Sequence, residues 1–133
     1  MIDHVGIPVS DYVRSKRFYQ AVLAALGAEL VMEVPADKTE DGYPACGFGR
    51  DGKPTFWIGG AVAMPGTPHF AFVVDTRAAV DAFHRTALAE GATDNGAPGV
   101  RPHYHPNYYA AFVLDRDGYN IEAVCHLPPE AKA

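Results

Sequence analysis

Two stretches decide the fold of this chain, His4-Val-Gly-Ile-Pro-Val-Ser10 (HVGIPVS) and His69-Phe-Ala-Phe-Val-Val-Asp75 (HFAFVVD), because they share one pattern at an offset of 65 residues (69 − 4 = 65). In each, a histidine is followed by alternating large apolar residues and then by a residue that can cap a helix. Alternation of this kind predicts a strand with one buried face. A helical apolar pattern follows each stretch, with Ser10 or Asp75 as the expected cap, and ends at Gly27 or Gly91.

The repeat continues beyond the helices. Arg50-Asp-Gly52 recurs as Arg116-Asp-Gly118, each time as a turn signal before an apolar run. The sequence therefore predicts two β-α-β-β-β modules within one domain over residues 1–133: module 1 over about 1–59, a Gly/Pro-rich linker over about 60–67, and module 2 over about 68–126. The expected strands lie near residues 2–9, 28–34, 44–50, 54–59, 68–75, 92–95, 108–115 and 119–126, which leaves 93–107 as a long connection.

Composition limits the classes of function. The chain of 133 residues has 48% hydrophobic and 20% charged residues, which is ordinary for a soluble globular domain. Its 11 Lys and Arg stand against 16 Asp and Glu without a basic run, which excludes nucleic acid and membrane surfaces as expected partners. No signal-peptide pattern opens the sequence, so we expect a cytoplasmic protein. Cys46 and Cys125 lie in apolar segments and are expected to be buried, reduced thiols.

Strand alternation selects three candidate metal ligands. His4 shares a strand face with Gly6 and Pro8, and His69 shares one with Ala71 and Val73, so each histidine is expected to point away from the helix-packed face. Glu122 places a carboxylate in the middle of an apolar strand, which is costly unless a positive group meets it. Two histidines and one carboxylate match the facial triad that holds Fe(II), and Mn, Zn, Ni or Co would also be tolerated. The alternative is a metal-free polar cluster in which Glu122 accepts hydrogen bonds from one or both histidines.

These features resemble the vicinal oxygen chelate superfamily, the group of glyoxalases, bleomycin resistance proteins and extradiol dioxygenases. The resemblance is carried by the two modules, the opening Ile2-Asp-His-Val5, His69, and Asp115-Arg-Asp-Gly-Tyr-Asn-Ile-Glu122, and it covers essentially the whole chain. It implies an α+β fold, a cupped eight-stranded half-barrel whose cavity holds one divalent ion that chelates adjacent oxygens of a small-molecule substrate. By match of motif, the metal positions are His4, His69 and Glu122. The family's habit of pairing modules also implies a homodimer.

The chain departs from the family pattern at two places. Arg116 stands where the family's turn commonly has proline, a change expected to matter little. Glyoxalase I-like members supply a fourth ligand, usually Glu, from the fourth strand, whereas the repeat places Phe56 or Trp57 opposite Glu122, depending on the offset. Because neither side chain binds a metal, the resemblance implies a three-ligand site like that of extradiol dioxygenases and several lyases, and not glyoxalase I itself. Phe56 and Trp57 are expected as substrate-binding wall residues, with plain core as the alternative.

The segment Arg101-Pro-His-Tyr-His-Pro-Asn-Tyr-Tyr109 (RPHYHPNYY) is the densest in versatile side chains. We expect it to form a wall or lid, in which Tyr104 and Tyr108 contact substrate and His105 and Tyr109 move a proton. A metal site built on His103 and His105 is an alternative, as is a protein interface. The favoured function is a metal-dependent dioxygenase, lyase or isomerase; the alternative is a non-catalytic sequestration protein of the bleomycin-resistance kind.

Overall fold

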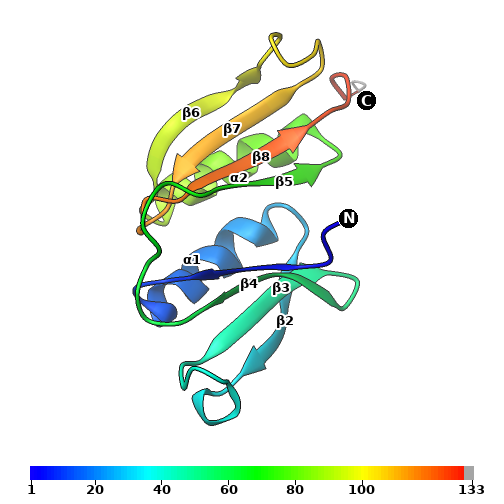
Figure 1. Ribbon diagram of the computed structural model, residues 1–133. Coiled ribbons are helices and arrows are strands. Elements are labelled where there is room, and N and C mark those ends of the chain that lie inside the picture. Colours follow the sequence, from blue (N-terminus) through cyan, green and yellow to red (C-terminus); the bar gives the residue numbers. More distant parts are fainter. Residues whose placement is uncertain (131–133) are drawn as a thin grey trace. The chain divides into compact units, whose positions relative to one another are not determined.

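The computed structural model describes residues 1–130 and divides the chain into two compact units, unit 1 (Met1–Gly66) and unit 2 (from Thr67 onward). In each unit one helix packs on a four-stranded sheet, as Figure 1 shows for each half of the chain. Both units have the element order β-α-β-β-β, apart from one short 3-10 turn in unit 1. The predicted α+β class is therefore confirmed. Neither helix found in residues 1–130 has the length and apolar character needed to cross a membrane.

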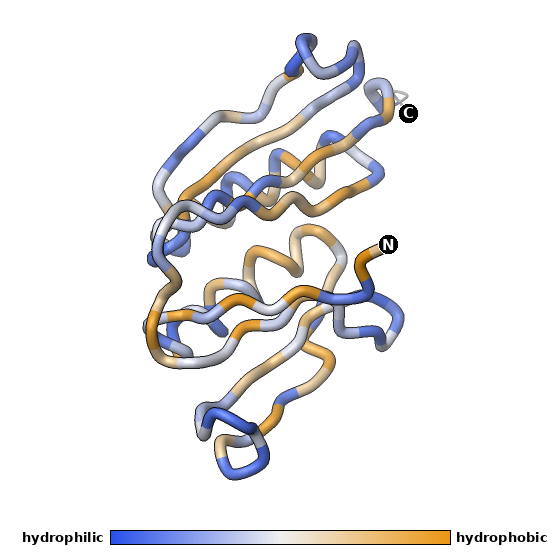
Figure 2. Tube along the Cα trace, viewed as in Figure 1, coloured by the Kyte–Doolittle hydropathy of each residue, from blue (hydrophilic) through white to orange (hydrophobic). Residues whose placement is uncertain are grey.

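Unit 1 consists of β1 (Val5–Pro8), α1 (Tyr12–Ala24), β2 (Glu29–Val34), the 3-10 turn η1 (Ala36–Lys38), β3 (Ala45–Arg50) and β4 (Lys53–Gly59). The strand order is β1-β4-β3-β2, and β1 runs parallel to β4. The hydropathy colouring of Figure 2 alternates between hydrophobic and intermediate along β1, is mixed along α1, and is mostly hydrophilic in the loop between β2 and β3. Alternate residues of the strands are buried with the apolar face of the helix, so the core of this unit consists of Ile7, Val9, Phe18, Tyr19, Val22, Leu23, Leu26, Cys46, Phe48, Phe56 and Ile58.

Unit 2 consists of β5 (His69–Val74), α2 (Arg77–Ala89), β6 (Thr93–Val100), β7 (Tyr109–Leu114) and β8 (Asn120–Cys125). Its strand order, β5-β8-β7-β6, repeats that of unit 1, with β5 parallel to β8. The side chains of β5 alternate as predicted: His69, Ala71 and Val73 are exposed. Cys125, like Cys46 in unit 1, is a buried free thiol, as expected.

The helix caps lie one residue later than predicted. Asp11, not Ser10, caps α1 by accepting the amide of Arg14 at 3.1 Å, and Thr76, not Asp75, caps α2 by accepting the amide of Ala79 at 3.1 Å. In both cases two capping residues stand side by side in the sequence, and the later one reaches the first helical turn.

The segment 93–107 is also more structured than predicted. Its first half forms β6, which pairs with β7 across two register shifts, and only 101–108 remain as a connection. Gly96 explains how a Gly/Pro-rich stretch forms this strand. It has a φ of 150°, and a Cβ there would stand 2.9 Å from the Phe112 ring, so the close approach of the two strands depends on glycine.

Candidate functional site

Glu122 is a buried carboxylate held by two side chains of unit 2. Its side chain is 2% exposed, in the centre of β8, and its Oε1 lies 2.8 Å from His69 Nε2. Its Oε2 accepts the Tyr108 hydroxyl at 2.5 Å. His69 is 47% exposed on the face of the sheet opposite α2, so the pair is reachable from outside. Two of the three predicted ligands, His69 and Glu122, are thus in direct contact.

His4, the third predicted ligand, lies in unit 1 just before β1, and its ring is oriented by an acidic neighbour. His4 Nδ1 lies 2.7 Å from Asp3 Oδ2, which also accepts Lys53 Nζ at 2.8 Å. These hydrogen bonds, with Lys53 first, lower the pKa of Asp3 below its usual value. Because the carboxylate takes the Nδ1 proton of a neutral imidazole, Nε2 keeps its lone pair. A carboxylate on the second nitrogen is the arrangement found around metal-binding histidines.

Strand pairing settles which residue of unit 1 corresponds to Glu122. Ala71 pairs with Glu122 in unit 2, and Gly6 pairs with Trp57 in unit 1. Across the neighbouring strands, Phe112 pairs with Glu122 and Gly47 with Trp57, so the offset is 65 throughout (122 − 57 = 65 and 112 − 47 = 65). Trp57 therefore occupies the position equivalent to Glu122, and Phe56 is excluded from it. The indole lies over Gly47, where an added Cβ would stand 2.7 Å from Trp57 Cε2.

A cluster of imidazole and phenol rings adjoins Glu122. The rings of His103, Tyr104, Tyr108, His105 and His126 follow one another at centroid distances of 4.2 to 5.5 Å. His105 Nδ1 accepts the amide of Asn107 at 3.1 Å, so in the neutral ring Nε2 carries the proton and donates it to His126 Nδ1 at 2.8 Å. Burial and the bond to Glu122 raise the pKa of Tyr108, which keeps its hydroxyl a donor. The structure thus brings Tyr104, His105 and Tyr108 together beside Glu122.

Two predicted site residues pack against the helix of their own unit. Tyr109 starts β7 on the face opposite to that of Phe112 and Glu122, and its hydroxyl donates to Asp81 of α2 at 2.6 Å. Its ring also lies under the guanidinium of Arg77, at 4.9 Å. Phe56 is buried against Tyr19 of α1, with a centroid distance of 5.1 Å. The hydroxyl of Tyr109 is therefore not brought to the Glu122 carboxylate, and Phe56 belongs to the core of unit 1.

The position of Tyr109 predicts how stability changes at alkaline pH. Burial, together with the hydrogen bond to Asp81, raises the pKa of Tyr109 from its ordinary value of 10.0 to about 12. Because the folded-state pKa is the higher one, its contribution to stability is complete below pH 10 and is lost as the pH rises through 12. We expect Tyr109→Phe to reduce the loss of stability over this window, measured by urea unfolding at several pH values. A change as large in Tyr43→Phe, an exposed tyrosine of unit 1, would contradict this assignment.

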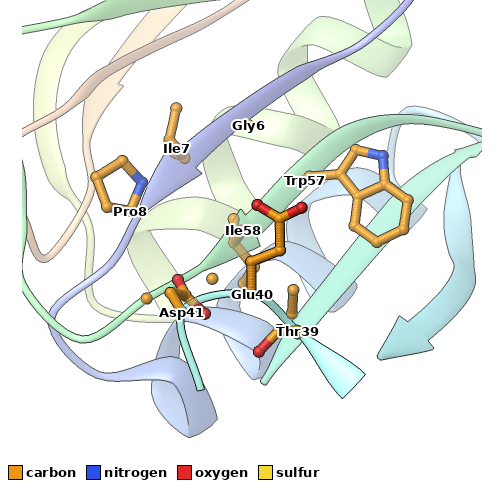
Figure 3. A pocket seen from close by; sticks show the side chains of 11 residues that line it. Gly6, Ile7, Pro8, Thr39, Glu40, Asp41, Trp57 and Ile58 are labelled. Carbon is orange, nitrogen blue, oxygen red and sulfur yellow. The ribbon is translucent and has the colours of Figure 1, made fainter. Parts of the chain in front are cut away.

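Unit 1 contains a cavity on the sheet face opposite α1. Its volume is ≈ 430 Å³, and its lining includes Gly6 and Pro8 of β1, Trp57 of β4, and the loop residues Thr39, Glu40 and Asp41. Figure 3 shows Trp57 on one side and Pro8 with Asp41 on the other, with Glu40 between them. Trp57, predicted as a substrate-binding residue, therefore lines a cavity that has acidic residues at its edge.

Several of these features escaped the sequence analysis. The sequence shows Asp3 next to His4 and a histidine at position 126. It does not indicate that Asp3 bonds to His4 or that His126 bonds to His105. Glu40 and Asp41 read as an ordinary polar loop. His84, on the second helix, is paired with Asp94 at 2.9 Å. Within neither unit, as far as residues 1–130 show, do three or more His, Cys, Asp or Glu side chains gather in a way that could hold a metal ion.

Comparison with known proteins assigns the family. The model of the Glyoxalase/Bleomycin resistance protein/Dioxygenase superfamily matches residues 1–123. A glyoxalase/bleomycin resistance protein from Albidiferax ferrireducens T118 is similar in structure, with 29% identity over 94% of this chain and 98% of that chain and a TM-score of 0.74. A glyoxalase/bleomycin resistance protein/dioxygenase family enzyme from Burkholderia phytofirmans PsJN has 25% identity, the same coverage and a TM-score of 0.69.

A more distant likeness extends to glyoxalase I from Zea mays. It has 19% identity over 93% of this chain and 45% of that chain, with a TM-score of 0.67, and supports the fold alone. No match was found among curated proteins. The repeated units, the strand order and the family model agree, and the chain belongs to the Glyoxalase/Bleomycin resistance protein/Dioxygenase superfamily.

Proposed function

We propose that this protein is a metal-dependent enzyme acting on a small substrate with two adjacent oxygens, of the dioxygenase, lyase or isomerase type. One observation carries the proposal: the carboxylate of Glu122 is buried in an apolar strand and meets the exposed imidazole of His69 at 2.8 Å. A buried carboxylate is costly without a positive partner, and imidazole with carboxylate is a donor set that divalent metals bind. Trp57 at the position equivalent to Glu122 supports a site without a fourth ligand, unlike that of glyoxalase I.

The side chains fit a divalent ion such as Fe, Mn, Zn, Ni or Co. His69 and Glu122, whose Nε2 and Oε1 lie 2.8 Å apart, would hold the ion together, because imidazole and carboxylate are both ligands of these metals. His4 is the proposed third ligand, since Asp3 holds its Nδ1 proton and leaves Nε2 as an acceptor. When bound, such an ion supplies Lewis-acid polarisation of a substrate oxygen.

The chain's own residues orient the carboxylate and handle protons. Tyr108 donates to Glu122 Oε2 and so fixes the rotation of the carboxylate. His105 stands beside Tyr108 with a ring-centroid distance of 5.5 Å and donates to His126. Imidazole is the side chain best suited to move a proton near neutral pH, so we assign proton transfer to His105, with His126 as its hydrogen-bond partner. The ring of Tyr104 lies tilted against that of Tyr108, with a centroid distance of 4.7 Å, and is proposed to contact substrate.

Metal binding tests the proposal directly. After chelator treatment and reconstitution with Mn(II) or Ni(II), we expect about one ion per chain, with His4→Ala and His69→Ala each lowering the affinity roughly a hundredfold or more. Asp3→Asn should lower it about tenfold, because the His4 ring loses the carboxylate that orients it. The control is His103→Ala, which removes a histidine stacked on Tyr104. Calorimetry and metal analysis measure these effects.

If His103→Ala and His105→Ala abolish binding while His4→Ala leaves it intact, the metal belongs to the RPHYHPNYY segment. If no divalent ion binds, the contact of His69 with Glu122 is a metal-free polar pair.

The second candidate function is a small-molecule binding protein without catalysis. The cavity of ≈ 430 Å³ beside Trp57 favours it, because its lining contains none of the proposed metal ligands. A homodimer and a cytoplasmic location stay predictions under either function.

A further inference from the structure

The cavity of unit 1 is an open pocket with the size of a binding site for a small organic molecule. Its ≈ 430 Å³ lies within the range of about 300 to 1,000 Å³ that is usual for such sites. It is lined by aliphatic and glycine residues of β1 and β4, by Trp57 and by the loop 39–41. Figure 3 shows these walls around one space.

The charge of the lining is of one sign. Glu40 and Asp41 both line the cavity, and no Lys, Arg or His does. The Glu40 carboxylate has no hydrogen-bond or ion-pair partner among residues 1–130. A concave surface that carries only negative charge concentrates cations.

The loop that carries these carboxylates is held by its own hydrogen bonds. Thr39 Oγ1 donates to the carbonyl of Tyr43 at 2.7 Å, and Asp41 Oδ1 accepts the amide of Tyr43 at 3.0 Å. The two bonds close the loop at Tyr43 and fix the backbone on both sides of Glu40. The loop backbone and the Asp41 carboxylate are therefore positioned in the free protein, which lowers the cost of ordering them around a ligand.

Trp57 adds an aromatic surface to the same cavity. Its ring-fusion atoms lie close to Gly47, where an added Cβ would stand 2.7 Å from Cε2 and 2.9 Å from Cδ2. The indole thus packs against Gly47, which has no side chain, and Trp57 lines the cavity. Indole is the aromatic group that attracts cations most strongly, and flat rings also stack on it.

We infer that this cavity binds a flat aromatic cation, with its ring against Trp57 and its charge beside Glu40 and Asp41. The inference rests on the second candidate function only in taking the cavity as a small-molecule site, and it needs no bound metal. Beyond that function, it specifies the charge and shape of the ligand and the residues that recognise them.

The test compares N-methylquinolinium, a flat cation, with quinoline, which has nearly the same shape and is neutral at neutral pH. Calorimetry in the presence of a chelator should show one N-methylquinolinium per chain, bound about tenfold more tightly than quinoline. Trp57 is the single tryptophan of the chain, so saturable quenching of its fluorescence reports the same site. Equal affinity for quinoline, or higher affinity for quinoline-2-carboxylate, would overturn the cation assignment but leave the cavity as a binding site.

Variants identify the residues. Glu40→Gln and Asp41→Asn should each lower the affinity for N-methylquinolinium about threefold to tenfold and leave the affinity for quinoline unchanged. Trp57→Leu should lower the affinity for both compounds, and Trp57→Phe should lower it less. Glu29→Gln, an exposed change of the same charge at the start of β2, is the control. The inference would be overturned if Glu40→Gln and Asp41→Asn, with folding verified by circular dichroism, bound N-methylquinolinium unchanged. It would also be overturned if binding appeared only with added metal. Neither result bears on the His69–Glu122 proposal.

Discussion

Glu122→Gln is expected to lower the affinity for Mn(II) or Ni(II) roughly a hundredfold or more while leaving stability nearly unchanged. Glutamine has the length and shape of glutamate, so its carbonyl oxygen can still accept the Tyr108 hydroxyl. Its amide can donate to His69 Nε2 once that ring takes the other tautomer. The free energy of unfolding should therefore change by no more than about 1 kcal/mol. What the variant loses is the negative charge that a divalent ion requires.

The two measurements separate a ligand from a structural residue. Metal affinity comes from calorimetry and stability from urea unfolding of the metal-free protein. Tyr108→Phe is a matched variant, because it removes the second hydrogen bond to Glu122 and keeps the charge. It should lower the affinity for the metal about tenfold, as expected for a group that orients a ligand. If Glu122→Gln bound metal like the unaltered protein, Glu122 would not be a ligand; if it unfolded, the carboxylate would be structural.

The sequence predicted the parts of the fold and site that depend on periodicity. Alternation along 69–74 and 120–125 places His69 on an exposed face and Glu122 in a buried strand, and both placements are confirmed. These features are local, because the direction of a side chain on a strand follows from its parity. The element order followed from the repeat for the same reason.

The features that were not predicted depend on pairing between distant residues. The offset between strands left Phe56 and Trp57 as alternatives, and the register of β4 against β1 and β3 decided for Trp57. Only the first part of β6, near residues 92–95, was predicted. Residues 96–100 were missed because Gly and Pro are poor strand formers, and their pairing with β7 outweighs that preference. The contact of His105 with His126 joins residues 21 apart that no local pattern links.

Unit 1 should depend strongly on the absence of a side chain at Gly49, where β3 meets the turn that leads to β4. A Cβ there would stand 1.8 Å from the carbonyl oxygen of Lys53 and 2.8 Å from its carbonyl carbon, so relief requires the backbone to move. The turn has little freedom to move, because Asp51 and Gly52, with φ of 52° and 74°, close it as a tight two-residue hairpin.

We therefore expect Gly49→Ala to destabilise the protein by about 3 kcal/mol or more, a large part of the total stability of a domain. Gly6→Ala is the matched control, since Gly6 lies in the same sheet and its Cβ would meet Trp57 Cβ at 3.6 Å, an ordinary contact. It should cost less than about 1 kcal/mol. Urea unfolding followed by Trp57 fluorescence reports unit 1 directly, because Trp57 is the only tryptophan and lies on the strand that the hairpin joins. If the two variants had equal urea midpoints, the β3–β4 hairpin would accommodate a methyl group at Gly49. The close approach of Lys53 would then not limit the stability of this unit.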